Sequence, residues 1–292
     1  MLEIQGLSKT YDNGIQALKN IFLKIPHGIF GLLGPNGAGK SSLMRTLATL
    51  QTADQGNVTL DGIDLLRDPQ QARRYLGYLP QDFGVYPQVS AAELLNQLAV
   101  FKGFVNAPER RGLVAEQLQL VNLYDQRDQK LGTFSGGMRQ RFGIAQALLG
   151  SPRLVIVDEP TAGLDPAERI RFQNLLATIS RDRVLLLSTH IVEDVAELCP
   201  KMAILDRGKI VQQGSPRTLM AHLQGRVWMC AAAPDQPIDP QWTIITTRME
   251  RGGRCVRVLS DTAPDASFQL VEPDLNDVYF TALMAQPVAI AV

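Results

Sequence analysis

The segment GPNGAGKS, residues 34–41, limits the folds open to this chain more than any other part of it. It matches the pattern G-x-x-x-x-G-K-[ST] in full. An apolar run, IFGLLG (29–34), leads into it, and a segment with helical character, KSSLMRTLATL (40–50), follows it. A glycine-rich loop between a strand and a helix lets backbone N–H groups curl around phosphates. The sequence therefore predicts a phosphate-binding loop on an α/β sheet.

The residues of this loop have separate expected tasks. Gly34, Gly37 and Gly39 allow the tight turn and the close approach of the backbone to the phosphates. Lys40 reaches the β- and γ-phosphates as a point charge, and the Ser41 hydroxyl is suited to hold Mg²⁺. The loop thus predicts a nucleoside triphosphate with its metal ion.

Other apolar runs extend the predicted sheet. LVIVD (154–158) and VLLLS (184–188) have the composition of strands that are buried on both faces of a parallel sheet. LEIQGL (2–7), FLKIP (22–26) and VTLDGIDL (58–65) are more mixed, and the last contains an Asp-Gly turn. These three fit a small antiparallel sheet beside the main one.

Polar residues follow several of the predicted strands. Asp158 ends one strand, where its carboxylate can meet the shell of a Mg²⁺ ion. Glu159 follows at once and, on an extended chain, points to the other side, which suits it to activate a water molecule. His190 and Gln81 also come just after predicted strands. Taken alone, His190 fits a surface position equally well, and a surface position is favoured for Gln81.

A second candidate anion site lies in FSGGMRQR, residues 134–141. Ser135 can cap a helix there, and Met138, Phe142 and Ala145 recur at helical spacing. A helix N-terminus with free N–H groups binds anions readily. Strand signals fade across about 82–150, so we expect a helical insertion in the α/β domain.

The composition changes after Leu223, and we expect residues 223–292 to form a small α+β accessory domain. Residues 242–260 predict two strands around a Gly-Gly turn, and Asp274 can cap a final helix. The tail 286–292 is expected to be loosely ordered. The simplest role for this part is packing or support of a dimer, without a ligand.

The overall composition narrows the class of partner. The chain has 29 basic and 29 acidic residues, so it lacks the basic excess typical of nucleic-acid-binding domains. Its apolar runs are far shorter than the roughly 18 residues of a membrane span. The three cysteines are widely spaced, which is typical of reduced thiols in ordinary packing. We therefore expect a soluble intracellular protein with no nucleic-acid partner.

Taken together in chain order, these motifs resemble the ATP-binding subunits of ABC transporters, over residues 1 to about 222. The matching segments are GPNGAGKS, Gln81, FSGGMRQR, LVIVDEP (154–160), GLD (163–165) and STH (188–190). The signature departs from the commonest family form, because Phe134 and Met138 stand where Leu and Gln are usual. The Ser-Gly-Gly core is intact.

The resemblance implies a P-loop NTPase core with a mainly parallel sheet, a small antiparallel β subdomain, the helical insertion and the C-terminal α+β domain. In that family two ATPase domains pair head to tail, and each ATP lies between the phosphate loop of one and the Ser-Gly-Gly helix of the other. Ser135 and Gly137 would then serve a γ-phosphate that is bound on a second subunit.

The resemblance also implies roles for single residues. Tyr11 would stack on adenine, and Asn36 and Ser42 would join the loop's nucleotide contacts. Asp165 would line the dimer interface. Gln81 would contact the metal ion or the attacking water and link the site to the helical insertion, which grips the membrane partner. Glu159 would be the general base, Asp158 a metal ligand, and His190 the sensor of the γ-phosphate.

The expected function is that of an ATP-hydrolysing subunit that dimerises around ATP and drives a separate integral membrane permease. It would be peripheral, on the cytoplasmic face of the cell membrane, as a homodimer or as a heterodimer with a related ATPase. YLPQDFGVYP (78–87), SGGMRQR (135–141) and PDLNDVYF (273–280) resemble the exporter branch for drugs, lipids or polysaccharides. The alternative is an ABC-type switch that acts on a cytosolic assembly. A module that binds ATP without hydrolysis is disfavoured by Glu159 and His190.

Overall fold

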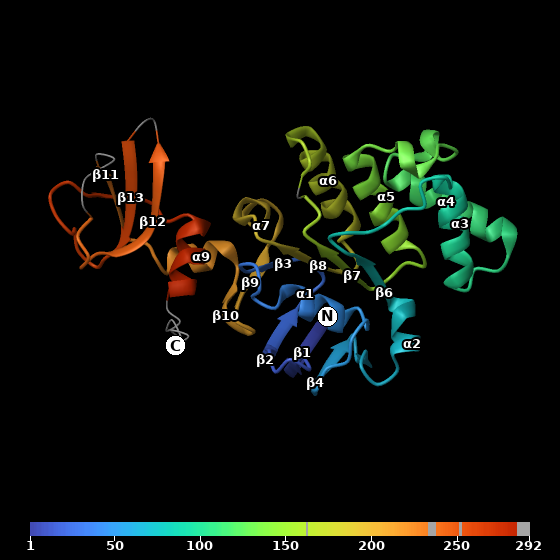
Figure 1. Ribbon diagram of the computed structural model, residues 1–292, viewed down its shortest axis with the longest axis horizontal. Helices are drawn as coiled ribbons and strands as arrows, with labels where there is room; N and C mark the ends of the chain where they lie inside the picture. Colours follow the sequence, from blue (N-terminus) through green and yellow to red (C-terminus); the bar gives the residue numbers. More distant parts are fainter. Residues whose placement is uncertain (162, 233–237, 251–252, 285–292) are drawn as a thin grey trace.

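The computed structural model describes residues 1–161, 163–232, 238–250 and 253–284 (Figure 1). Its centre is a six-stranded sheet with the order β10-β9-β3-β8-β7-β6. The strands β6, β7, β8, β3 and β9 run parallel, and β10 is antiparallel to β9. The mainly parallel sheet is therefore confirmed. Its strands are β3 (Gly28–Leu33), β6 (Leu76–Leu79), β7 (Leu154–Asp158), β8 (Val184–Thr189), β9 (Lys201–Asp206) and β10 (Lys209–Gly214).

The small antiparallel sheet is also confirmed, with the order β2-β1-β4-β5. The Asp-Gly turn between its last two strands has both residues in the left-handed region, with φ of 48° at Asp61 and 82° at Gly62. Such a turn matches the twist of a two-residue hairpin. The strands are β1 (Leu2–Thr10), β2 (Gln16–Ile25), β4 (Gln55–Leu60) and β5 (Ile63–Asp64).

The main sheet is covered on both faces. Along β7, Val155 and Val157 belong to the apolar core that contains the helices of the insertion, α6 (Pro166–Ile179) and α7 (Val192–Leu198). Leu154 and Ile156 point to the other core, which contains the antiparallel sheet and α1 (Lys40–Leu47). This alternation explains why the strands read as continuous apolar runs.

The predicted insertion consists of α3 (Ala91–Phe101), α4 (Ala107–Leu120), α5 (Gly136–Leu148) and two short 3₁₀ turns. A capping box starts α3, because Ser90 Oγ accepts from the Glu93 N–H and the Glu93 carboxylate accepts from the Ser90 N–H. Ser135 caps α5 as predicted, with its Oγ 3.2 Å from the Met138 nitrogen. A short helix α2 (Pro69–Ala72) precedes the insertion.

A third sheet follows the nucleotide-binding part, with the order β12-β13-β11-β14. In Figure 1 it lies at the end of the molecule opposite α3 and α4. The predicted Gly-Gly turn falls at 252–253, of which only Gly253, the first residue of β13, is described, and the tail 286–292 lies outside the described residues. The elements are α8 (Pro216–Ala221), β11 (Val227–Ala232), β12 (Thr243–Glu250), β13 (Gly253–Leu259), β14 (Gln269–Leu270) and α9 (Leu275–Met284).

Helix α9 joins this sheet to the main core. Asp274 caps it as predicted, since the Asp277 N–H donates to Asp274 Oδ1 at 3.0 Å. The buried Asp277 carboxylate also accepts two hydrogen bonds from Arg257 of β13, at 2.8 and 2.5 Å. On its other side, Val278 and Tyr279 are buried in the core that α7 shares. Helix α9 therefore packs against both the third sheet and the main core.

No helix in the described ranges combines the length and the apolar character that crossing a membrane would require. The three cysteines are free thiols, of which Cys199 and Cys230 are buried.

The packing of α5 on β6 yields a test of the fold. A Cβ at Gly77 of β6 would lie 2.1 Å from the carbonyl oxygen of Ala147, near the end of α5. Gly77→Ala should therefore cost about 1–3 kcal/mol of unfolding free energy, measured by chemical denaturation. Gly112 of α4 has no atom within 4 Å of such a Cβ, so Gly112→Ala should stabilise by about 1 kcal/mol. Equal midpoints for the two variants would contradict this packing.

Candidate functional site

The phosphate loop closes tightly around the lysine side chain. Lys40 Nζ donates to the carbonyl oxygens of Gly34, at 2.6 Å, and Pro35, at 3.1 Å. A Cβ at Gly34 would lie 2.4 Å from the carbonyl oxygen of Leu205, and Gly39 has a φ of 107°. Only glycine fits this close approach and this left-handed turn. The loop therefore places the ammonium group and backbone N–H groups at the start of α1.

A cavity of about 780 Å³ opens at this loop, at the carboxyl edge of the main sheet. It brings together most of the residues that the sequence singled out, from five separate segments of the chain. The lining includes Tyr11, Asn36, Gly37, Gly39, Lys40, Ser41, Ser42, Gln81, Glu159 and His190. A site of this size and position suits a nucleotide.

Glu159 is the meeting point of the polar side chains in the cavity. Its Oε2 lies 3.1 Å from His190 Nδ1 and accepts a hydrogen bond from Gln81 Nε2 at 3.2 Å. Its Oε1 lies 3.8 Å from Lys40 Nζ. The carboxylate thus faces the imidazole, the amide and the ammonium group at once.

The prediction that Glu159 continues an extended strand is wrong. The strand β7 ends at Asp158, and Glu159 has a φ of 46°, in the left-handed region. Its N–H still donates to the carbonyl oxygen of Ser188 on β8, at 2.9 Å. The direction of the side chain therefore comes from a sharp turn that β8 stabilises. A non-glycine residue in this conformation stores strain, and such strain is concentrated at functional sites.

Asp158 lies below the cavity with only 4% of its surface exposed. Burial raises the pKa of its carboxyl group, and the nearby Glu159 charge acts in the same direction, whereas Lys40 opposes them. Burial lowers the pKa of Lys40, while the Glu159 and Asp158 carboxylates raise it. Two carboxylates thus share one ammonium group, which leaves excess negative charge that a divalent cation can neutralise.

The residues present fit a Mg²⁺ ion that phosphate oxygens help to hold. Asp158 is a buried carboxylate without a full counter-charge, and the Ser41 hydroxyl lies close enough to lower its pKa by hydrogen bonding. Within the described ranges, no group of three His, Cys, Asp or Glu side chains is arranged to hold a metal ion alone. Mg²⁺ commonly binds through one or two carboxylates plus substrate phosphates, so these two facts agree.

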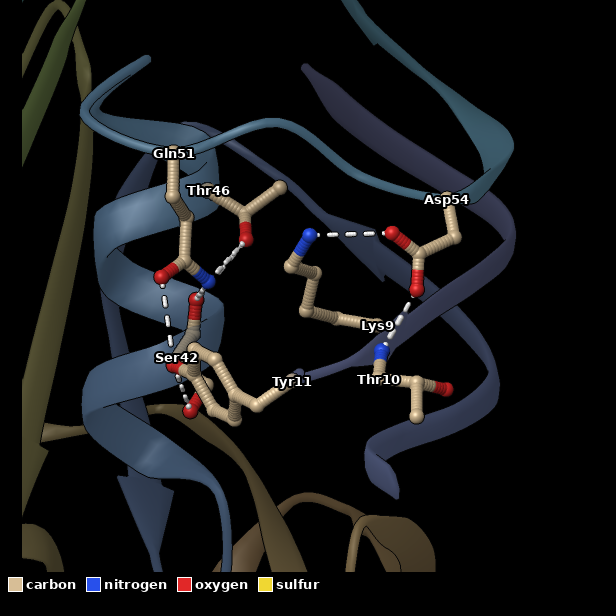
Figure 2. A network of polar contacts seen from close by, with 7 residues as sticks. All are labelled: Lys9, Thr10, Tyr11, Ser42, Thr46, Gln51 and Asp54. Atoms are coloured by element: carbon tan, nitrogen blue, oxygen red, sulfur yellow. Dashed lines mark hydrogen bonds and ion pairs between the residues drawn. The ribbon is translucent and has the colours of Figure 1, made fainter. Parts of the chain in front are cut away.

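Tyr11 stands at the mouth of the cavity, in a network of hydrogen bonds (Figure 2). Its hydroxyl lies 2.9 Å from Ser42 Oγ and donates to Gln51 Oε1 at 3.2 Å. Gln51 Nε2 in turn donates to the Ser42 carbonyl oxygen and to Thr46 Oγ1 of α1. Asp54 accepts from Lys9 Nζ and from the Thr10 N–H, which fixes the end of β1 beside Tyr11. The ring is thereby tied to the phosphate-loop helix.

Sequence reasoning missed one wall of the cavity, which β2 and the turn after β9 supply. This wall contains Gln16, Ala17, Lys19, Arg207 and Gly208. The Gly208 N–H donates to the Ala38 carbonyl oxygen, and a Cβ at Gly208 would lie 2.7 Å from the Ala17 carbonyl oxygen. No local pattern marks these residues, because only the pairing of β9 beside β3 brings them to the loop.

Three of the predicted site residues lie elsewhere. Among the described residues that line the cavity, none belongs to the Ser-Gly-Gly segment or to GLD. Ser135 and Asp165 are exposed at the N-termini of α5 and α6, which they cap. Gly137 is buried against Glu168, where a Cβ would lie 2.3 Å from Glu168 Oε2. The N-terminus of α5, which the sequence predicts as a second anion site, therefore does not line the cavity at this chain's own phosphate loop.

Comparison with known proteins decides the family. The family model described as ABC transporter matches residues 18–162. The Nod factor export ATP-binding protein I of Burkholderia thailandensis is 34% identical over 220 residues, which are 75% of this chain and 72% of that protein. This chain belongs to the ABC transporter family.

Two further similarities agree. The daunorubicin/doxorubicin resistance ATP-binding protein DrrA of Streptomyces peucetius is 35% identical over 228 residues, which are 77% of this chain and 68% of that protein. The dimeric post-hydrolysis structure of the ATP-binding cassette MJ0796, bound to ADP and Pi, has a TM-score of 0.66 and 28% identity. That likeness covers 74% of this chain and 98% of the cassette.

The family assignment makes this chain an ATP-binding and ATP-hydrolysing subunit of a transporter. The likeness to the cassette also confirms the P-loop NTPase fold that the motifs predicted.

The buried charge of Asp158 yields a test of the site's electrostatics. Because burial raises its pKa above the unfolded value, the ionised carboxylate destabilises the folded ATPase above the raised pKa. Asp158→Asn should therefore raise the thermal midpoint of the nucleotide-free protein near pH 7 by about 2–4 °C. The gain should fade as the pH falls through the raised pKa.

Glu116→Gln is the control for this test, because it neutralises an exposed acid in the interior of α4. It should leave the midpoint unchanged near pH 7. An Asp158→Asn protein that is less stable than the parent near pH 7 would show that Lys40 already compensates the carboxylate fully.

Proposed function

We propose that this ATPase binds ATP with Mg²⁺ in the cavity described above and, as a pair of identical chains, drives a membrane permease that exports its substrate. The observation that carries the proposal is the convergence of Lys40, Gln81, Glu159 and His190 on one cavity at the edge of the sheet. The ammonium group of Lys40, the amide of Gln81 and the imidazole of His190 each lie within 4 Å of the Glu159 carboxylate.

The phosphate loop would bind the triphosphate. Lys40 would leave the carbonyl groups of Gly34 and Pro35 for the β- and γ-phosphates, which supply a stronger, charged acceptor. Asn36, Gly37 and Gly39 line the same cavity and would offer their N–H groups to the phosphates, and Ser42 follows on α1. At the mouth, Tyr11 offers its ring to the base.

Asp158, Ser41 and Gln81 are the residues that would hold Mg²⁺. The ion would neutralise charge on the phosphates and on the buried Asp158 carboxylate. Gln81 donates a hydrogen bond to Glu159 at 3.2 Å, so its amide also lies beside the proposed base.

Glu159 would accept the proton of the attacking water. Its carboxylate faces the cavity and is held by hydrogen bonds or ion pairs on both oxygens, which fixes its direction. His190 would contact the γ-phosphate from the same side, because it is half-exposed beside Glu159 and lines the cavity. These groups are what hydrolysis by a positioned water needs.

The Ser-Gly-Gly helix would complete the site of a second copy. Ser135 and Asp165 are exposed and lie outside this chain's cavity, so they are free to meet another subunit. The dimeric structure of the MJ0796 cassette supports a pairing of two such chains. Gly137 would let the backbone approach the γ-phosphate closely. A homodimer needs no other ATPase, because one chain carries both halves of the site.

Glu159→Gln tests the proposed base. It should lower kcat for ATP hydrolysis by at least about 10²-fold while ATP binding persists, because the amide cannot accept the proton. It should also trap an ATP-dependent dimer, measured by size-exclusion chromatography with light scattering. Glu193→Gln, on the exposed face of α7, should hydrolyse ATP like the parent. Unchanged turnover in Glu159→Gln would refute the role of Glu159.

A groove of about 830 Å³, lined by residues of β6, α3 and α5 and by Leu50, is the proposed docking site for the permease. It includes Pro80, the residue directly before Gln81 of the nucleotide cavity. Phe101 is 85% exposed on its rim, and Leu50 is 54% exposed. A large exposed apolar patch beside basic side chains is typical of a protein–protein interface. Docking there would place the subunit on the cytoplasmic face of the cell membrane.

Phe101→Ser tests this groove. It should reduce the permease that co-purifies with the Glu159→Gln protein by about tenfold or more, since aromatic anchors dominate interfaces. The matched control is Phe22→Ser, because Phe22 is 57% exposed on β2, outside the groove. Thermal midpoints check that both variants fold. Equal recovery of the permease from both variants would reject the groove.

Export as the direction of transport rests on the relatives. One is named for Nod factor export and another for daunorubicin/doxorubicin resistance. We also propose that residues 1–222 are the ATPase unit, with the insertion at about 82–150, and that 223–292 are an accessory domain. The start of the third sheet at Val227 supports this division.

A further inference from the structure

A buried carboxylate behind the nucleotide site takes no part in the chemistry proposed so far. Asp194 lies on α7 and is 1% exposed. Its Oδ2 accepts a hydrogen bond from Thr161 Oγ1 at 2.6 Å. Its Oδ1 accepts from Arg169 Nε at 2.9 Å and from Gln173 Nε2 at 3.0 Å, and Arg169 Nη2 lies 2.8 Å away.

The donors come from two segments that also carry site residues. Thr161 follows Glu159 with only Pro160 between them. Arg169 and Gln173 lie on α6, whose N-terminus is capped by Asp165. Asp194 itself is four residues after His190, on the helix that this histidine precedes. The Asp194 carboxylate thus connects α7, the helix after His190, both to the segment that follows Glu159 and to α6.

The segment after β7 and the segment after β8 also contact each other directly, through Glu159 and His190. That contact is 3.1 Å long, and the Glu159 N–H bonds to the Ser188 carbonyl oxygen just before His190. The Thr161–Asp194 hydrogen bond is a second connection between the segment after β7 and the helix after β8. Because Glu159 stands in the left-handed region, its direction depends on such support.

The strength of this support follows from burial. A charged acceptor gives short, strong hydrogen bonds, and a buried carboxylate that loses a donor pays a desolvation penalty. Thr161 is 4% exposed, so water does not replace its hydroxyl. The helix α6 is anchored in the main core by Phe172 and Leu176. The network therefore fixes both loops against a rigid element.

We propose that Asp194 is a positioning residue for hydrolysis, which acts through Thr161 to hold Glu159 and His190 at the distance that turnover needs. The inference rests on the proposed role of Glu159 as the base. It assigns to Asp194 no contact with ATP.

Thr161→Val is the decisive variant, because it removes one hydroxyl and leaves the Asp194–Arg169 ion pair in place. It should lower kcat about tenfold, since a small misplacement of a reacting group costs that much or more. The KM for ATP should stay within about twofold, because no residue of the phosphate loop changes. Thr161→Ser keeps the hydroxyl and should restore kcat to within about twofold of the parent.

Thr178→Val on α6 is the matched control, because Thr178 is exposed and its hydroxyl donates to the Asn174 carbonyl oxygen of its own helix. It should leave kcat and KM unchanged. Changing Asp194 itself is less informative, since it would leave Arg169 without its buried counter-ion and would unfold part of the chain.

Thermal midpoints separate positioning from mere stability. If Thr161→Val lowers the midpoint but keeps kcat within twofold of the parent, the network only stabilises the fold and the inference is wrong. Failure of the proposed function is a different result, because Glu159→Gln would then turn over like the parent. If Glu159→Gln loses turnover while Thr161→Val keeps it, the inference about Asp194 is wrong and the proposed role of Glu159 stands.

Discussion

The burial of both faces of the main sheet is the constraint on which the rest of this structure depends. Parallel strands need crossover connections, and the helices of those connections cover the faces. The strands β3, β7 and β8 then end at one edge, where the phosphate loop, Glu159 and His190 follow directly. The cavity forms there because this edge is where the chain leaves the sheet and loops can meet.

The charged groups of the site are arranged unfavourably in the protein without a ligand. Two carboxylates lie beside one ammonium group, and burial disfavours the charged forms of Asp158 and Lys40 alike. Such an arrangement is costly in the ligand-free protein and would become favourable if a phosphate chain and a cation bound together. The proposed binding of ATP with Mg²⁺ would therefore relieve an electrostatic cost that the ligand-free fold carries.

The sequence predicted the features that depend on interactions between neighbouring residues. The phosphate loop, the strand that ends in Asp158 and the Ser135 cap each depend on a few consecutive residues. It could not predict contacts that tertiary packing creates. Gln51 behind Tyr11 and the wall at Arg207 belong to this class. The left-handed turn at Glu159 was also hidden, because a buried strand ending in two acids reads as extended to its last residue.

The separation of Ser135 from Lys40 within one chain has a consequence for how the activity is shared. In the proposed pair of identical chains, each ATP site would draw its two halves from different molecules, so turnover per chain would fall on dilution as pairs come apart. Two inactive chains can also repair each other. When a chain with a damaged Lys40 pairs with a chain with a damaged Ser135, one site collects both defects and the other site collects none. In that arrangement the interface between two chains would be the functional unit, because one chain alone would supply only half of each site.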